Sequence, residues 1–311
     1  MNSSEKSRLV KKLAFDSGFD ACGIAESEIL TVDALHLKKW LDAGSHAEMR
    51  FMQNHFEKRI DPAKLMEGAK SVIVVLLNYF PKVYPFGKKQ LKISRYALGI
   101  DYHFVIKKKL TRLIQNLQDS FSHLKGKNFV DSAPILERVW ARKAGLGWIG
   151  KNSLLLNRQM GSYFFIGGII TNHEFEYNEL IEPQHCGTCT RCLDSCPTKA
   201  IVSPGVLDSG KCISYQTIEN KNQVPEEISR KLNGWIFGCD ICQEVCPWNK
   251  KLKVHKTEEF LSDKKLLDTT SDDLINLSEG QFNVLFKNSA VKRIKYSKFK
   301  GNVEANMNFI S

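Results

Sequence analysis

Apolar residues recur with helical and strand periods in turn over residues 1–175. The continuous apolar runs at 71–77 and 163–170 predict buried strands, the first of them over 71–80, and both runs are far shorter than the ~20 residues of a membrane helix. The other expected elements are strands at 20–25 and 128–131 and helices at 3–17, 31–43, 101–124 and 134–144. Strands separated by helices indicate an α/β domain over residues 1–175.

Charge and composition narrow the choice of partner and compartment. The chain has 45 Lys and Arg against 34 Asp and Glu residues, a net charge of +11. This surplus favours a polyanionic partner, although net charge alone is weak support. An apolar fraction of 42% excludes a disordered chain. No apolar segment follows the charged N-terminus, so we expect no secretory signal, no membrane association and a cytoplasmic location.

Eight of the nine cysteines lie between residues 186 and 246. In a cytoplasmic protein such a group indicates metal binding rather than disulfides. We therefore predict a ferredoxin-like domain over residues 176–255, organised by its metal, followed by a basic helical segment over 256–311. The ninth cysteine, Cys22, falls in an apolar strand, where a free cysteine behaves as a small hydrophobe without a metal role.

The cysteine spacing is typical of bacterial ferredoxins with two [4Fe–4S] clusters, in which the fourth cysteine of each motif serves the other cluster. The first motif is Cys186-x2-Cys189-x2-Cys192-x3-Cys196-Pro197, and the second is Cys212 followed by Cys239-x2-Cys242-x3-Cys246-Pro247. The crossed assignment gives one cluster the ligands Cys186, Cys189, Cys192 and Cys246. It gives the other cluster Cys196, Cys212, Cys239 and Cys242.

Structural zinc is the alternative to two clusters. Zinc sites use paired cysteines separated by a longer gap, and four cysteines within 186–196, followed by proline, fit that pattern poorly. Paired clusters move single electrons but do no bond chemistry by themselves. We therefore expect a second redox centre elsewhere in the chain.

Seven segments together form a specific pattern. They are RIDPAKLMEGAKSVIV (59–74), SRYALGIDYH (94–103), VDSAPILERVWARKAGLGWIGKNSLL (130–155), CGTCTRCLDSCPTKAI (186–201), KCISYQTIE (211–219), GCDICQEVCPWNK (238–250) and FKNSAVKRIKYSKFKGNVEANM (286–307). This pattern resembles the epoxyqueuosine reductase family over nearly the whole chain. Longer family members carry a C-terminal helical-repeat domain, and this chain stops before it, so we expect a short form of the family.

The resemblance implies a cobalamin-dependent enzyme with two [4Fe–4S] clusters. Its cobalamin-binding α/β domain would resemble those of reductive dehalogenases. The implied reaction is the last step of queuosine biosynthesis, the reduction of epoxyqueuosine to queuosine in the anticodon loop of tRNA. The expected partners are tRNA bearing epoxyqueuosine and an external electron donor, whose electrons pass through the clusters to cobalt, and the chain itself is expected to be a monomer.

Loss of the epoxide oxygen as water needs a nearby general acid. The resemblance points to Asp131, which lies at the C-terminal end of a predicted strand, where α/β sheets place their ligands. Burial beside a cofactor would raise the pKa of this carboxyl into a useful range. The alternative is that Asp131 caps the helix that begins near Pro134.

The resemblance also implies cobalamin contacts at Arg59, Ser94, Asp131, Asn152 and Ser214. Asn152 follows a glycine turn, which lets the backbone approach a ligand closely. The alternatives are a surface salt bridge for Arg59 and a turn or cap role for Ser94 and Ser214.

Tyr102 and His103 begin a predicted helix, where a lone histidine is typically a satisfied polar group. We therefore predict no histidine ligand to cobalt.

Basic and aromatic residues are candidates for RNA contact. Lys107–Lys109 and the tail residues Lys287, Lys292, Arg293, Lys295, Lys298 and Lys300 are candidates for phosphate binding. A solvated lysine face is the alternative. Trp148, Tyr215 and Trp248 are candidates for stacking on bases, with core packing as the alternative, which we prefer for Trp148.

Three other functions remain open at this point. A reductive dehalogenase would use the same cofactors on a small organohalide, although the basic charge and the lack of a twin-arginine signal oppose it. A ferredoxin fused to an inert domain would hold no cobalt. A nucleic-acid-binding protein with structural clusters would be redox-silent.

Overall fold

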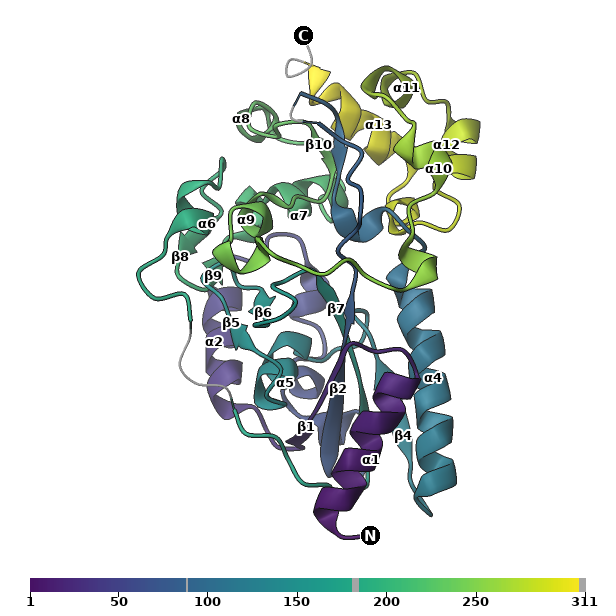
Figure 1. Cartoon of the computed structure of the whole chain (residues 1–311). Coiled ribbons are helices and arrows are strands. Elements are labelled where there is room, and N and C mark those ends of the chain that lie inside the picture. Colours follow the sequence, from purple (N-terminus) through teal and green to yellow (C-terminus); the bar gives the residue numbers. More distant parts are fainter. Residues whose placement is uncertain (88, 181–184, 308–311) are drawn as a thin grey trace.

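A four-stranded sheet lies at the centre of the N-terminal half of the computed structural model (Figure 1). The strand order is β1-β2-β7-β4, and every neighbouring pair runs antiparallel. The structure describes residues 1–87, 89–180 and 185–307. The strands are β1 (Ala21–Glu26), β2 (Ser71–Asn78), β4 (Gly126–Phe129) and β7 (Phe164–Thr171). These ranges confirm the four predicted strands within one or two residues.

The sheet is buried on both faces, as the continuous apolar runs require. Successive side chains of a strand point to opposite faces, so β2 contributes Ile73, Val75 and Leu77 to one core and Val72, Val74 and Leu76 to the other. The helices α1 (Ser3–Asp16) and α4 (Tyr102–Ser120) cover the first face. The second face packs against α2 (Thr31–Asp42), α3 (Phe56–Ile60) and α5 (Glu137–Lys143). This layering confirms the predicted α/β class.

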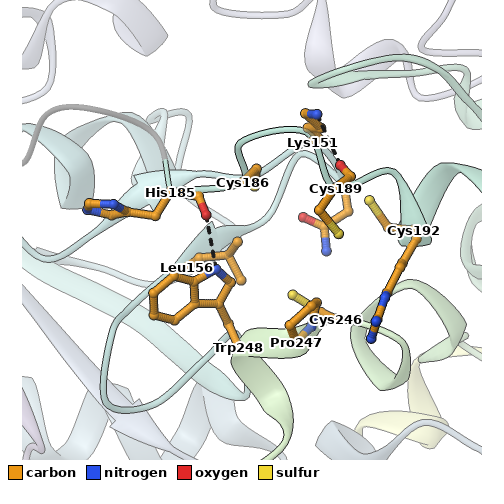
Figure 2. A pocket seen from close by; sticks show the side chains of 11 residues that line it. Lys151, Leu156, His185, Cys186, Cys189, Cys192, Cys246, Pro247 and Trp248 are labelled. Carbon is orange, nitrogen blue, oxygen red and sulfur yellow. Dashed lines mark hydrogen bonds between the residues drawn. The ribbon is translucent and has the colours of Figure 1, made fainter.

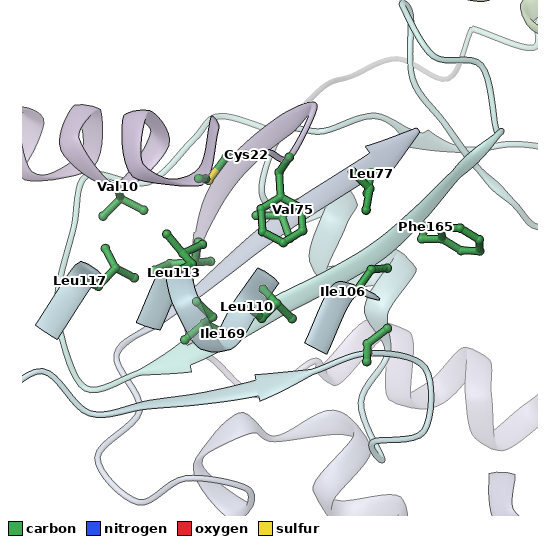
Figure 3. Close-up of a cluster of buried hydrophobic side chains, with 14 of the residues drawn as sticks. Val10, Cys22, Val75, Leu77, Ile106, Leu110, Leu113, Leu117, Phe165 and Ile169 are labelled. Carbon is green, nitrogen blue, oxygen red and sulfur yellow. The ribbon is translucent and has the colours of Figure 1, made fainter. Parts of the chain in front are cut away.

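Helix α4 brings its N-terminus to the end of the sheet. Its residues Ile106, Leu110, Leu113 and Leu117 recur at helical spacing and face the strands (Figure 3). Asp101 caps the helix by accepting a hydrogen bond from the backbone N–H of His103 at 3.0 Å. The helix ends at Ser120 rather than at 124, because Phe121 is extended and buried in the first core.

The turn after β4 differs from the expected strand-to-helix connection. Asp131 has a left-handed backbone with φ 48°, and α5 begins only at Glu137, after the N-cap Leu136. The residue before a proline disfavours helical geometry, so Ala133 and Pro134 delay the helix. Asp131 does not cap α5, since α5 has no side-chain cap hydrogen bond. The capping alternative is therefore wrong.

The cysteine-rich region is built from short elements. Its strand β10 (Trp235–Phe237) pairs in parallel with β3 (Lys92–Ile93). A hairpin of β5 (Trp148–Ile149) and β6 (Leu155–Leu156) packs against Cys246. The remaining elements are α6 (Arg191–Asp194), β8 (Ile201–Ser203), β9 (Val206–Leu207), α7 (Ile213–Ile218), α8 (Glu226–Ser229) and α9 (Ile241–Glu244).

The C-terminal helices share one hydrophobic core with residues 86–98 and with β10. Buried amides fix the last helix, because Asn302 donates to the carbonyls of Thr217 and Ile236 at 2.8 and 3.0 Å. The helices are α10 (Lys264–Leu267), α11 (Ser271–Ile275), α12 (Glu279–Leu285) and α13 (Tyr296–Glu304).

The domain boundaries at 175 and 255 stay predictions. Residues 181–184 and 308–311, which fall in the predicted second and third domains, lie outside the described residues. Across the described residues, no helix has both the length and the apolar character of a membrane span.

Candidate active site

Four thiols surround one cavity of about 280 Å³. Cys186 and Cys189 come from the loop that leads into α6, Cys192 lies in α6 itself, and Cys246 follows α9. Figure 2 shows Cys189 and Cys246 approaching the cavity from opposite sides. The other lining residues are Lys151, Asn152, Leu156, His185, Arg191, Pro247 and Trp248. The structure thus brings together the four cysteines of the first predicted ligand set.

The other four cysteines interact with one another. Burial raises the pKa of Cys242, and repulsion from Cys212 and Cys196 adds to the rise. Burial likewise raises the pKa of Cys239, which also faces Cys242 and Cys212. Cys192 of the first set also acts on Cys242. The two predicted ligand sets therefore adjoin, and a bound metal is what would deprotonate such buried thiols.

The donors are arranged for something larger than one ion. Among the residues that the structure describes, no three His, Cys, Asp or Glu side chains converge closely enough to hold a single metal ion. A zinc ion would draw four sulfur atoms to within about 2.3 Å of one point. Four thiols spread around a cavity of about 280 Å³ suit a cluster of several atoms instead.

Asp131 lies in a second polar group, at the N-terminus of α4. Its Oδ2 accepts a hydrogen bond from the Tyr102 hydroxyl at 2.9 Å and lies 3.1 Å from Nε2 of His103. Nδ1 of His103 lies 2.8 Å from Oδ1 of Asp101. The Asp131 backbone N–H donates to the Glu137 carboxylate. The imidazole is therefore held between two carboxylates.

These contacts shift the acid–base equilibria of the group. Burial raises the pKa of Asp131, but the hydrogen bonds from His103 and Tyr102 outweigh burial and lower it overall. Burial lowers the pKa of His103. Its hydrogen bonds to Asp101 and Asp131 outweigh burial, so that the pKa rises from 6.5 to about 9. Burial, with repulsion from Asp131, raises the pKa of Glu137 to about 8. The predicted rise in the pKa of Asp131 is therefore wrong, because its hydrogen bonds lower this pKa.

Arg293 connects this group to the cysteine-rich region. Its Nη1 lies 4.0 Å from Oδ2 of Asp131, and its Nη2 lies 2.6 Å from Oε1 of Glu219. Glu219 is the C-cap residue of α7, the helix that begins directly after Cys212. Arg293 of the C-terminal segment thus links Asp131 to α7, the helix beside the second set of thiols.

Comparison with known proteins decides the family. Residues 59–132 match a family profile described as epoxyqueuosine reductase QueG, DUF1730. An epoxyqueuosine reductase of Cyclobacterium marinum is 47% identical over 305 residues, which cover 97% of each chain. The chain belongs to the epoxyqueuosine reductase family. This finding confirms the resemblance seen in the sequence and opposes the dehalogenase and ferredoxin alternatives.

Other epoxyqueuosine reductases agree with this assignment. A Pseudomonas aeruginosa member is 39% identical, covering 94% of this chain and 82% of its own. A crystal structure of an epoxyqueuosine reductase with an epoxyqueuosine-modified tRNA stem loop is 29% identical and superimposes with a TM-score of 0.91, over 99% of this chain and 82% of that one. Residues 185–249 match a 4Fe-4S double cluster binding domain. That range holds all eight grouped cysteines, so it confirms clusters rather than zinc.

The residues predicted to contact cobalamin lie in several places. Arg59 and Ser94 are buried, and the Arg59 Nε and Ser94 Oγ atoms have no hydrogen-bond partner. The Arg59 guanidinium donates instead to the Phe51 carbonyl, rather than forming the salt bridge considered above. Asn152 is buried in the cysteine cavity, with its Nδ2 unpartnered. Ser214 is half-buried beside Cys212, whose sulfur accepts its backbone N–H.

The aromatic residues proposed to stack on bases mostly contact other residues of the protein. Trp148 is buried, as preferred, and packs edge-on against Trp248. Tyr215 is buried and accepts a hydrogen bond from the Glu48 backbone at 3.1 Å. Trp248 lines the cysteine cavity. These contacts favour packing roles for Trp148 and Tyr215.

Two lysines of the basic tail donate hydrogen bonds to backbone carbonyls of the same chain. Lys298 donates to the Asn222 carbonyl at 2.8 Å, and burial lowers its pKa to about 8. Lys300 donates to the Ile275 carbonyl. On α4, by contrast, Lys107 and Lys108 are exposed beside the exposed Phe104. The exposed side of α4 is thus both basic and aromatic.

Sequence reasoning undervalued two members of the polar group. His103 was expected to be merely a satisfied polar group, and both its ring nitrogens do have partners, but one of these is Asp131. The pairing of Asp101 with His103 at one helix start was a usable signal. Arg293 was counted only among the basic charges of the tail, because nothing local in the sequence links it to Asp131.

Proposed function

We propose that this protein reduces epoxyqueuosine in tRNA to queuosine. Membership of the epoxyqueuosine reductase family over almost the whole chain carries this proposal. The tRNA stem loop bound in the structure of a similar protein supports an RNA substrate. The surplus of 11 positive charges and the basic face of α4 beside Asp131 are compatible with a polyanion.

Two [4Fe–4S] clusters would carry the electrons. Cys186, Cys189, Cys192 and Cys246 would hold one cluster at the 280 Å³ cavity. Cys196, Cys212, Cys239 and Cys242 would hold the other, since their thiols act on one another. Each cluster passes one electron at a time, so an external donor must supply two electrons for each epoxide reduced.

Cobalamin is the second redox centre that fits the chain. Buried polar groups without partners are costly, and Arg59, Ser94 and Asn152 each have such a group, as residues awaiting a polar ligand would. These residues, together with Asp131 and Ser214, would hold the amide-rich cofactor. When bound, cobalamin supplies the reduced cobalt that acts on the epoxide.

Asp131 would deliver a proton to the departing oxygen. Its Oδ2 already accepts two hydrogen bonds, from Tyr102 and His103, which fix its direction. A positioned proton donor of this kind typically contributes 10²–10⁴-fold to a rate. Nine cysteines without disulfides are typical of a reducing compartment, so we place the reaction in the cytoplasm. We further propose that the enzyme acts as a monomer.

Anaerobic preparation of the protein, with metal analysis and nucleoside mass spectrometry, tests the proposal. We expect about eight iron atoms per chain, four for each cluster, together with cobalt after loading with cobalamin. Epoxyqueuosine in added tRNA should lose one oxygen atom when a strong one-electron reductant is present. A colourless protein that binds zinc, or a loaded protein that leaves the epoxide intact, would contradict the proposal.

A further inference from the structure

His103 is held at both ring nitrogens by carboxylates. Nδ1 lies 2.8 Å from Oδ1 of Asp101, and Nε2 lies 3.1 Å from Oδ2 of Asp131. Asp101 cannot turn away easily, because the same oxygen also caps α4 through the His103 backbone. The Tyr102 ring stacks on the imidazole with centroids 4.2 Å apart. The same ring also stacks on Phe165, at 4.2 Å, and meets Tyr96 edge-on. The imidazole is therefore fixed in place and in plane.

The charges around this imidazole favour its protonated form. Asp101 and Asp131 bond to it directly, and Glu137 also faces it across the turn. Arg293 opposes them from the C-terminal segment, 4.0 Å from Asp131, but Glu219 draws that guanidinium away at 2.6 Å. Tyr102 and Tyr96 complete the titratable neighbours. Two ionised carboxylates, Asp101 and Asp131, thus act on His103 against one partly neutralised cation, because the pKa of Glu137, raised to about 8, leaves that carboxyl mostly protonated at neutral pH.

This arrangement leaves Asp131 without a proton of its own. Its hydrogen bonds from His103 and Tyr102 stabilise the carboxylate and lower its pKa. An ionised carboxylate cannot protonate a departing oxygen. The proton must therefore come from a group that touches Oδ2 and can release a proton near neutral pH. Tyr102 touches Oδ2 but keeps its proton, because burial and the neighbouring Asp131 raise the pKa of its hydroxyl.

We propose that His103 is that group: a positioning residue that stores a proton and passes it from Nε2 through Oδ2 of Asp131 to the substrate oxygen. The inference rests on the proposed function. In the overall step both C–O bonds of the epoxide break, a C=C bond forms, and the oxygen leaves as water. Two electrons come from the external one-electron donor. One proton comes from His103, and the second comes from water, which reaches Asp131 because 46% of its side chain is exposed.

The competing explanation is structural. His103 could simply hold the strained turn at Asp131, where φ is 48°. His103→Gln separates the two explanations, because glutamine keeps an N–H donor for Oδ2 but has no proton to release near neutral pH. His36→Gln is the matched control, since His36 is exposed on α2.

Single-turnover rates of the loaded enzyme should be measured as a function of pH. We expect the wild-type rate to fall above about pH 9, where His103 loses its proton. His103→Gln should be slower by about 10²-fold at neutral pH and should lose this alkaline limb, while iron content and tRNA affinity stay unchanged. Asp101→Asn should move the limb to lower pH. Added imidazole should partly restore the rate of His103→Ala.

Two results would overturn the inference. One is a His103→Gln variant that keeps the wild-type rate, or that is slower but keeps the alkaline limb. The other is an NMR titration of the histidines: the wild-type signal that is missing from the His103→Gln spectrum would titrate near 6.5 rather than well above it. A failure of the proposed function is distinguishable, because the wild type would then leave the epoxide intact at every pH.

Discussion

The pair Arg95–Asp240 offers a quantitative test of how the second set of thiols is held in place. The Asp240 side chain is 2% exposed and that of Arg95 14%, with Nη1 and Oδ2 3.1 Å apart. The Arg95 backbone N–H also donates to Oδ2 at 2.9 Å. Asp240 directly follows Cys239 and is the N-cap residue of α9, the helix that carries Cys242. Arg95→Met keeps the apolar stem and removes the charge.

The buried carboxylate sets the size of the effect. Burial raises the pKa of Asp240, and Arg95 only partly offsets this, so removing Arg95 leaves an uncompensated charge. Breaking such a buried pair costs roughly 3–5 kcal/mol, against a total stability of about 5–15 kcal/mol. For a chain of 311 residues the expected fall in Tm is roughly 5–8 °C. Arg95→Met/Asp240→Asn should recover much of it, because the one carboxylate then left without Arg95 is that of Glu244, whose side chain is 39% exposed and can be solvated.

Anaerobic thermal unfolding of the loaded protein, followed by circular dichroism, measures this effect. Iron content, measured alongside, reports whether the Cys239–Cys242 turn still holds its cluster. Lys12→Met is the control, because Lys12–Asp16 is a surface pair with Lys12 71% exposed, worth less than about 1 kcal/mol. A Tm for Arg95→Met that matches the control, or a double variant no more stable than the single one, would refute the reasoning.

Three further predictions concern the clusters, the histidine and the RNA. Cys246→Ser should lower the iron content from about eight to about four atoms per chain, whereas Cys22→Ser, which alters a cysteine buried in the first core, should leave the iron content unchanged. The raised pKa of His103 stabilises the folded state fully below 6.5, and this stabilisation is lost as pH rises through about 9; the Tm of the wild type should therefore fall more steeply than that of His103→Gln between these values. Replacing Lys107 and Lys108 with glutamine should reduce the salt dependence of tRNA binding by about one unit of slope for each of these lysines that binds a phosphate.

Local patterns in the sequence predicted the sheet and the thiol sets well. The strand β2 could be recognised because it is buried on both faces, which makes its apolar run continuous. The cysteine spacing predicted which thiols gather at the cavity, because Cys186, Cys189 and Cys192 are close in sequence and the ferredoxin pattern supplies Cys246.

Contacts between distant segments could not be predicted in this way. Arg293 reaches Asp131 only because the C-terminal helices pack on residues 86–98 and β10, through side chains such as Phe282 and Phe299. No periodicity encodes that packing. The backbone at Asp131 was also missed, since a left-handed aspartate leaves little trace in the sequence.

Conversion of tRNA by Asp131→Asn tests the central claim most directly. Asparagine nearly matches aspartate in size and can still accept the hydrogen bond from Tyr102, so the fold and the clusters should persist. We expect this variant to retain its iron and its affinity for tRNA while nucleoside mass spectrometry detects no queuosine, under conditions in which the wild type converts the epoxide. Queuosine formed by Asp131→Asn at the wild-type rate would contradict the account.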